Sequence, residues 1–297
     1  MYFFDLTALS VCNKPIGKMS VALGTFDGVH LGHREILKRA SESNLPLCAV
    51  TFSENPFGTP MITLLDEKLR LFADCGAKYA LVLDFSEIVN LSYESFFRDI
   101  IIGRCDAKYA YCGFNYRFGK NAAGTPELLC DMMADYNGEC ICIPPVCKEG
   151  DVISSSRIRN ALTNGDIALA SRLLGRRYSV TSTVVHGNEI GRKIGFPTMN
   201  FDICDNFLLP ENGVYITTLK EKVCITDIGI RPTVDGDGSR VCETHIINEQ
   251  GDYYGQKIKI EFHKKIRNEM KFSSLSELSE QLSRDKKTAT DYFINQK

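Results

Sequence analysis

Two histidines stand three residues apart in the stretch VALGTFDGVHLGHREIL, where an apolar run gives way to glycines and then to a helical pattern. Gly24 and Gly28 allow the backbone to turn sharply and to approach a ligand closely. His30 and His33 would lie on the first turn of the helix, where free N–H groups and the helix dipole favour anions. The pattern predicts a phosphate site. The alternative, a connection with two solvated histidines, explains less, since glycines, aspartate and both histidines together are more specific than a glycine-rich loop.

A second candidate site lies in HGNEIGRKIGFPTMN, residues 186–200. Its glycines make a flexible loop, and its two adjacent cations suit a polyphosphate. Thr198 and Asn200 stand two apart, so on an extended strand their side chains point to the same side. A hydroxyl and an amide oxygen are hard ligands suited to Mg²⁺. Taken alone, such a loop is more often a mobile connection than a phosphate clamp. The glycines and cations are Gly187, Gly191, Gly195, Arg192 and Lys193.

The elements that must position the first site alternate between strand and helix up to about residue 150. This alternation predicts right-handed crossovers and a parallel, doubly wound sheet of the α/β class. Ligands of such sheets bind at the carboxyl ends of the strands, which is where the histidine pair falls. The expected strands are 19–26, 46–53, 79–85, 106–113 and 139–146, and the expected helices are 31–43, 63–76, 92–102 and 125–137.

The character of the chain changes after two expected helices in 154–175, which are broken at Gly165. From Tyr178 to about Phe262 only strand-like runs follow, separated by Gly, Asn, Asp and Pro clusters, which indicates an all-β unit. The tail 273–285 is helical, with three leucines on one face and a capping box at its start. We therefore predict two domains, 1–177 and 178–297, the second a small β-barrel closed by one helix.

Composition excludes several classes of protein. The net charge of −2 gives no sign of the basic face expected of a nucleic-acid binder. The apolar runs are far shorter than a membrane span, and the N-terminal segment lacks the basic leader and cleavage site of a signal peptide. The twelve cysteines include no C-x-x-C pair, so a metal site is disfavoured. We expect reduced thiols that act as small buried hydrophobes in a cytoplasmic protein.

The first motif, GTFDGVHLGH, resembles the G-x-F-D-x-x-H-x-G-H signature of the nucleotidyltransferase superfamily. Its Phe-Asp-Gly-Val-His form is typical of the bifunctional bacterial riboflavin kinase/FAD synthetases, and the resemblance continues in GFNYRFGKNAAGT (113–125) and ISSSRIR (153–159). It implies a Rossmann-like domain that adenylylates FMN with ATP. Its implied catalytic residues are His30 and His33, and its implied nucleotide-binding residues are Gly24, Phe26, Asp27, Gly28, Asn115, Ser155, Ser156 and Arg159. A helix-capping role for the serines is compatible with this.

One segment departs from that family. Phe-x-Pro-His-Pro usually follows the second strand, whereas this chain has FSENP, with Glu54 and Asn55 in place of Pro-His before Pro56. Any contribution of the missing histidine is therefore lost or supplied elsewhere.

The second motif, PTMN, resembles the Pro-Thr-Ala-Asn motif of riboflavin kinases, and ETHIIN (243–248) resembles their Glu-x-His strand. The resemblance implies an antiparallel Greek-key barrel in which Glu243 is the base that deprotonates the ribityl 5′-hydroxyl. DIGIRPT (227–233) matches with Asp227 in place of Asn. The implied nucleotide-binding residues are Gly187, Arg192, Thr198, Asn200, Ile246, Asn248 and Tyr254; the flavin-binding residues are Arg267, Met270 and Phe272; the Mg²⁺ ligands are Thr198 and Asn200. Phe272 could equally pack in the core.

Taken together, the resemblance implies a cytoplasmic bifunctional enzyme that acts on riboflavin, FMN and Mg-ATP, without nucleic-acid or membrane partners. Its oligomeric state is not predicted. Two alternatives stay open. One half could be degenerate, with the altered FSENP segment making the adenylyltransferase the more exposed half. The chain could instead be a flavin- or nucleotide-binding regulator, although a regulator has no need of a base and metal ligands together.

Overall fold

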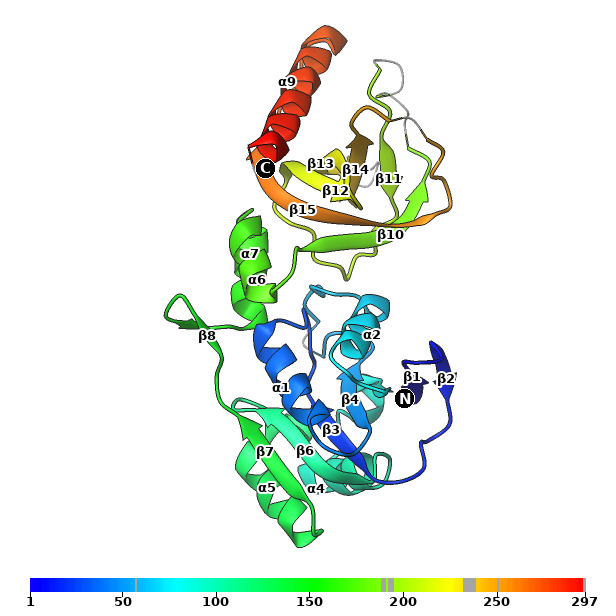
Figure 1. The fold of residues 1–297 in the computed structure, drawn as a ribbon, viewed down its shortest axis with the longest axis vertical. Helices are drawn as coiled ribbons and strands as arrows, with labels where there is room; N and C mark the ends of the chain where they lie inside the picture. The colour runs from blue at the N-terminus through cyan, green and yellow to red at the C-terminus, as the bar shows by residue number, and fades with distance from the viewer. Residues whose placement is uncertain (57, 188–190, 192–194, 232–238, 250, 296–297) are drawn as a thin grey trace. The chain divides into compact units, whose positions relative to one another are not determined.

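The computed structural model describes residues 1–297 except 57, 188–190, 192–194, 232–238, 250 and 296–297 (Figure 1). By its internal contacts the chain separates into two compact units, Met1–Ser155 and Ser156–Lys297. Each unit is described by itself below.

The first unit is built on a seven-stranded sheet with the order β2-β1-β5-β4-β3-β6-β7. The five strands from β5 to β7 in that order pair in parallel, which confirms the predicted doubly wound sheet. The two outer strands β1 and β2 form an antiparallel hairpin that pairs with β5 and that the sequence analysis did not predict. The strands are β1 Tyr2–Asp5, β2 Ser10–Cys12, β3 Met19–Leu23, β4 Leu47–Phe52, β5 Tyr79–Leu83, β6 Ala107–Gly113 and β7 Glu139–Ile143.

Helices cover both faces of this sheet, so the central strands are largely apolar; β3 is buried at all five positions, and Ser20 is its one polar residue. One core gathers around Val21, Phe97 and Leu129, and the other around Ala22, Leu37 and Phe72, on opposite faces of the sheet because alternate β3 residues point to opposite sides. The helical segments are α1 Leu31–Ser41, α2 Leu65–Asp74, α3 Phe85–Ile88, α4 Tyr93–Phe96, the π-helical η1 Phe97–Ile102, the 3₁₀ turn η2 Lys120–Ala122 and α5 Pro126–Asp135.

In the chain, a short hairpin of β8 (Cys147–Lys148) and β9 (Asp151–Val152) follows the last strand of the sheet. The helices α6 (Ser155–Thr163) and α7 (Ile167–Leu174) come next, before the first strand of the barrel. The predicted break between the two helices is confirmed, because Gly165 has a φ of +71°, which lies outside the helical region. Both helices, apart from Ser155 at the start of α6, group with the barrel residues in the second unit.

The second unit contains a closed barrel with the strand order β10-β11-β14-β13-β12-β15, in which every pair is antiparallel. This confirms the predicted barrel. Threonine hydroxyls bond to one another in its interior, Thr217 to Thr226 and Thr226 to Thr244, each at 2.7 Å. The strands are β10 Ser179–Val185, β11 Met199–Phe201, β12 Gly213–Leu219, β13 Lys222–Arg231, β14 Ser239–Ile246 and β15 Lys257–Arg267.

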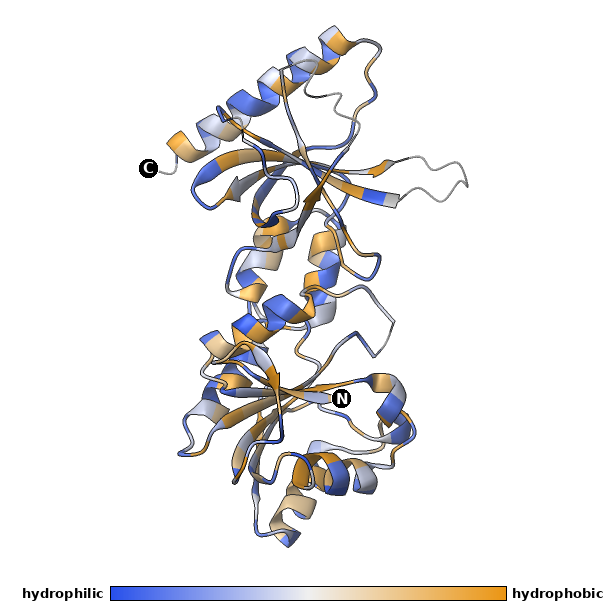
Figure 2. Ribbon diagram, turned by 90° about the vertical axis from the view of Figure 1, so that its right-hand side faces the viewer, coloured by the Kyte–Doolittle hydropathy of each residue, from blue (hydrophilic) through white to orange (hydrophobic). Residues whose placement is uncertain are grey.

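The final helix, α9 (Leu275–Ile294), packs its apolar residues on the outside of the barrel. Ser274 caps it by accepting the Glu277 N–H at 3.2 Å, as the sequence predicts. The Glu277 carboxylate accepts the Ser273 N–H at 2.9 Å, so the return bond of the capping box is made one residue before the cap. The helix is longer than predicted, because Ala289 and Phe293 continue the apolar face past residue 285. Figure 2 shows hydrophobic residues concentrated on the strands of both units, with mixed hydropathy along the helices. Within the described residues, we find no helix both long enough and apolar enough to span a membrane.

Candidate active sites

The first site is built on a strained turn between β3 and α1. Phe26 and Val29 have φ values of +51° and +40°, which are rare for residues with side chains, and Gly28 has +87°. The Val29 N–H bonds to the Phe26 carbonyl at 3.1 Å, closing the turn. The fully buried Phe26 ring packs edge-on against Phe72 with 5.4 Å between centroids. Core packing therefore holds the turn in a conformation that the chain would otherwise avoid.

The turn delivers the two histidines to one point, as the sequence predicts. His30 caps α1: its Nδ1 accepts the His33 N–H at 3.2 Å. The imidazole rings stack with centroids 3.6 Å apart and 18° between planes. An Nδ1 that accepts leaves the proton of a neutral imidazole on Nε2, so His30 presents an N–H donor at its far edge. The pair stands at the helix end where backbone N–H groups and the dipole attract an anion.

Asp27 has a scaffolding position beneath this pair. Its carboxylate is buried and accepts the Ile62 N–H at 2.9 Å and the Thr63 N–H at 3.3 Å. Its main-chain carbonyl accepts a hydrogen bond from Ser155 Oγ at 2.8 Å. One residue thus fixes the turn, the segment before α2 and the start of α6.

The remaining residues assigned to this site lie on other elements of the chain. Asn115 is exposed and comes just after β6. Because β6 pairs in parallel with β3, Asn115 lies at the same carboxyl edge of the sheet as the turn that follows β3. Ser156 and Arg159 lie on α6 in the second unit, which is described by itself. The divergent FSENP segment follows β4, where Glu54 is exposed and Asn55 Nδ2 donates to Thr59 Oγ1 at 2.7 Å.

Sequence reasoning missed one residue near this site, Lys68. Its side chain lies on the inner face of α2 with Leu69 and Phe72, and only 1% of its surface is exposed. The sequence did carry a signal: Lys68 stands one residue before Leu69 and four residues before Phe72, so it falls within the apolar stripe of an amphipathic helix.

The second site is a row of polar side chains across three strands of the barrel. Asn200 of β11 stands directly opposite Glu243 of β14, and Glu243 stands directly opposite Asp227 of β13. Directly opposed residues project to the same side of a sheet. Thr198, which precedes β11, places its Oγ1 3.5 Å from a carboxylate oxygen of Glu243. The predicted metal ligands and the predicted base are therefore neighbours.

The loop before this row makes a close approach that only glycine permits. A Cβ at Gly187 would fall 2.2 Å from Nδ2 of Asn200. Gly191 lies further along, where its carbonyl accepts the Phe196 N–H at 2.8 Å. Arg192 and Lys193, the predicted polyphosphate cations, lie outside the described residues, and so do the last two residues of DIGIRPT, Pro232 and Thr233.

The other described residues predicted to bind the nucleotide are not members of this row. Tyr254 stacks on His186 with 3.8 Å between ring centroids. Ile246 is buried at the end of β14, and Asn248 is exposed with a φ of +61° in the turn that follows. His245 has its Nδ1 2.9 Å from the Pro197 carbonyl. Burial, partly opposed by that contact, lowers the pKa of His245, so the ring is neutral near pH 7.

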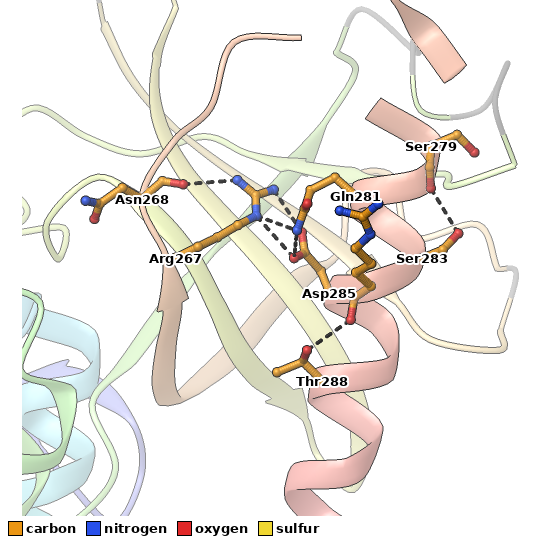
Figure 3. Close-up of polar contacts among 8 residues, drawn as sticks. Arg267, Asn268, Ser279, Gln281, Ser283, Asp285 and Thr288 are labelled. Atoms are coloured by element: carbon orange, nitrogen blue, oxygen red, sulfur yellow. Dashed lines mark hydrogen bonds and ion pairs between the residues drawn. The ribbon is translucent and has the colours of Figure 1, made fainter. Parts of the chain in front are cut away.

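Arg267, predicted to contact the flavin, forms an ion pair with Asp285 of α9 (Figure 3). Its Nε and Nη2 bond to the two carboxylate oxygens at 2.8–3.1 Å, and Gln281 also donates to Asp285 at 2.8 Å. The pair is largely shielded from solvent, so it fastens α9 to the end of β15. The Arg267 guanidinium lies 6.0 Å from the half-buried ring of Phe272, whereas Met270 is exposed.

Asp227 is the unusual member of the row. Loss of hydration, with the negative charges of Glu269 and Glu243, raises its pKa to about 6, and Arg267 opposes the shift. Asp227 keeps an exposed surface, so the charges of the neighbouring carboxylates act on it together with the loss of hydration.

The expectation for the cysteines holds only in part. All twelve lie in the described residues and are free of disulfides, and Cys48, Cys105, Cys112, Cys224 and Cys242 are buried, but in the outer strand β7 Cys140 is half-buried and Cys142 is exposed. Among described residues, we find no cluster of three His, Cys, Asp or Glu side chains that could hold a metal ion.

Comparison with known proteins bears on both units. A riboflavin kinase family model matches residues 174–293, and an FAD synthetase family model matches residues 13–157. The bifunctional riboflavin kinase/FMN adenylyltransferase of Escherichia coli strain K12 is 37% identical over 290 residues, which is 92% of each chain. The protein of that name from Bacillus subtilis strain 168 is 35% identical over 299 residues, 94% of this chain and 93% of its own. A crystal structure titled macrolide-efflux protein, from Streptococcus pneumoniae, superposes with a TM-score of 0.82 at 31% identity, covering 96% of this chain and 97% of that one.

Proposed function

The chain belongs to the family of bifunctional riboflavin kinase/FMN adenylyltransferases, and from that premise we propose how its residues divide the two reactions. It phosphorylates riboflavin to FMN and adenylylates FMN to FAD. The proposal assigns the first reaction to the Asn200–Glu243–Asp227 row and the second to the histidine pair. The observation that carries it is the register that sets Glu243 directly beside Asn200 and within 3.5 Å of Thr198, since a base and hard oxygen ligands meet there.

In the kinase reaction, Glu243 takes the proton of the ribityl 5′-hydroxyl as that oxygen forms its bond to the γ-phosphorus of ATP. The bond between the γ-phosphorus and the bridging oxygen breaks, and ADP leaves. The Thr198 hydroxyl near the carboxylate and the Asn200 amide opposite it keep Glu243 within a fixed polar row. The nucleotide-side roles of Gly187, Arg192, Ile246, Asn248 and Tyr254, and the flavin-side roles of Arg267, Met270 and Phe272, are proposed on the resemblance.

The donor set of this row fits Mg²⁺. Hydroxyl and amide oxygens are the hard ligands that this ion takes together with substrate phosphates. The glycine at position 187 lets the loop backbone pack directly against the Asn200 amide, where a side chain would overlap it. We propose that Thr198 and Asn200 hold the ion. When bound, Mg²⁺ would neutralise charge on the ATP phosphates.

In the adenylyl transfer, a phosphate oxygen of FMN bonds to the α-phosphorus of ATP, and pyrophosphate leaves. Catalysis of this kind needs positioning and charge neutralisation rather than a covalent intermediate. His30 and His33, at the positive end of α1, would donate to the triphosphate oxygens as charge develops. Ser155, Ser156 and Arg159 are proposed phosphate ligands on the resemblance alone, and Asp27 and Asn115 are proposed positioning groups.

The proposal places the protein in the cytoplasm, acting on small-molecule substrates, and keeps the domain boundary at 177/178. One experiment tests its core. Purified protein is incubated with riboflavin, ATP and Mg²⁺, and FMN and FAD are separated over time. We expect FMN to appear first and FAD to follow. FMN without FAD would show that the adenylyltransferase half is degenerate, and binding of riboflavin without turnover would favour a regulator.

A further inference from the structure

Lys68 is a charged side chain inside the core of the first unit. It sits on α2 with 1% of its surface exposed, among residues that pack against the sheet. Burying an ammonium group is costly unless hydrogen bonds and an opposite charge compensate. A methionine would fill a similar space at no such cost. The charge therefore needs an explanation.

The ammonium group connects the ends of two strands. Lys68 Nζ lies 3.2 Å from the Thr25 carbonyl, 3.3 Å from Thr51 Oγ1 and 3.2 Å from the Phe52 carbonyl. The Thr51 hydroxyl in turn donates to the Thr25 carbonyl at 2.9 Å. Thr25 follows β3, and Phe52 ends β4. These acceptors lie at the carboxyl edge of the sheet, where the strained turn begins.

An opposite charge accompanies this network. Burial lowers the pKa of Lys68 to about 8, and the negative charge of Asp27 opposes that shift. Asp27 is also buried, and it holds the Ile62 and Thr63 amides. Lys68 thus faces the turn on two sides, through the Thr25 carbonyl and through the charge of Asp27.

We propose that Lys68 is a positioning residue for the adenylyl transfer, which holds the Thr25 carbonyl and thereby fixes the turn that carries His30 and His33. This rests on the proposed function of that turn. The peptide that follows the Thr25 carbonyl leads into Phe26, whose φ of +51° needs external support. Fixing this carbonyl gives the histidines one position relative to the phosphates. Lys68 touches no reacting atom in this proposal; it acts through the turn.

The test compares Lys68→Met with Arg70→Met in the full-length protein. Arg70 is on the same helix, but 59% of its side chain is exposed. We measure kcat and KM for conversion of FMN to FAD, below the temperature at which either variant begins to unfold. Lys68→Met should lower kcat by roughly 10²-fold, as expected for displacement of catalytic groups by about 1 Å. Arg70→Met should not change kcat, and riboflavin phosphorylation should be unchanged in both. Unchanged kcat in folded Lys68→Met would overturn the proposal.

Thr51→Val provides a second variant in case Lys68→Met does not fold. It removes one acceptor of Lys68 and the bond to the Thr25 carbonyl without burying a new charge. We expect kcat to fall about 10-fold, in line with a smaller displacement. Where both single variants fold, the double variant should lose less than the product of their effects, since the residues share one network. Independent effects would contradict the shared role.

Hydrogen exchange gives a readout that does not need activity. The backbone amides of residues 25–29 should exchange faster in Lys68→Met, or in Thr51→Val, than in Arg70→Met. Unchanged exchange would overturn the positioning role even if the unmodified protein makes no FAD. Absence of FAD from the unmodified protein, combined with faster exchange in the variant, would instead refute the proposed function of the turn while supporting its dependence on Lys68.

Discussion

The two candidate sites are assembled in opposite ways. The histidine site comes from one turn and one helix end, so its main residues lie within ten positions, Gly24 to His33. The kinase site comes from β11, β14 and β13, so Asn200, Glu243 and Asp227 meet only through strand register. A site built locally depends on the conformation of one backbone segment. A site built across strands depends on the register of the whole barrel.

The largest effect is expected when the barrel is separated from the first unit. A fragment beginning at Tyr178 should fold, make FMN from riboflavin and Mg-ATP, and make no FAD. A longer fragment, 156–297, should do the same with a higher melting temperature, because it keeps the Glu211 N–H to Leu162 carbonyl bond at 2.9 Å and the Ser171 contact of Tyr178. Thermal unfolding and product analysis check both. A folded but inert fragment would show that the kinase assignment is wrong.

Glu243→Gln tests the site built across strands. The amide keeps the shape of the side chain but cannot accept the hydroxyl proton, so riboflavin phosphorylation should fall by roughly 10²–10⁴-fold. Riboflavin and Mg-ATP should still bind, because Thr198 and Asn200 are unchanged. FMN supplied directly should still become FAD at the normal rate. Full kinase activity would exclude Glu243 as the base.

His30→Ala tests the site built locally. Loss of an oriented donor should cost about 2–4 kcal/mol of transition-state stabilisation in FAD formation, with FMN formation unchanged. Alanine also removes the cap of α1, so His30→Asn is the matched control. Asparagine caps helices well, and the variant should therefore keep the stability of the unmodified protein and still lose FAD synthesis. If His30→Asn restores activity, the histidine serves only as a cap. His33→Ala should impair FAD formation by a similar amount.

Gly187→Ala tests how far the kinase site depends on the position of Asn200. The added Cβ would collide with the Asn200 amide, 2.2 Å away, so the amide must shift. We expect kinase kcat to fall by about 10-fold, less than the cost of a full 1 Å displacement, with a higher Mg²⁺ concentration needed for half-maximal rate. Steady-state rates over a Mg²⁺ series check this. An unchanged Mg²⁺ dependence would remove Asn200 from the proposed ligands.

Asp227→Asn has the smallest expected effect. The pKa of Asp227 is raised to about 6 in the folded protein, against about 3.9 in an unfolded chain. Between pH 4 and 6 the unfolded chain has lost a proton that the folded protein retains, so this group lowers the free energy of unfolding as pH rises through that window. Asparagine removes the penalty, so the variant should be more stable at pH 7, by less than about 1 kcal/mol because the carboxylate is exposed. Urea unfolding at pH 4 should show no difference; a larger gain at pH 4 than at pH 7 would contradict this origin.

The sequence predicted the local site better than the distributed one, for a physical reason. Residues three apart in the first turn of a helix lie on the same side, so the pairing of His30 and His33 could be predicted from their sequence positions alone. The register that joins Asn200 to Glu243 depends on how four other strands close the barrel, and only the resemblance indicated it. Lys68 and the Arg267–Asp285 pair were missed because long side chains select partners through tertiary packing. The β1–β2 hairpin was missed because strands of four and three residues are too short to show a clear alternation of apolar and polar residues.

The two sheets also differ in how they would behave in a concentrated solution. The barrel is closed, whereas the seven-stranded sheet has two edge strands, β2 and β7. An open strand edge is a template for another molecule's strand, and closure removes such edges. Partial burial and the neighbouring thiols raise the pKa of the exposed Cys142 on β7 to about 11, so little thiolate is available for oxidation near pH 7. Self-association of the purified protein should therefore proceed by strand pairing at one of these two edges and, where it involves β7, respond little to added reductant.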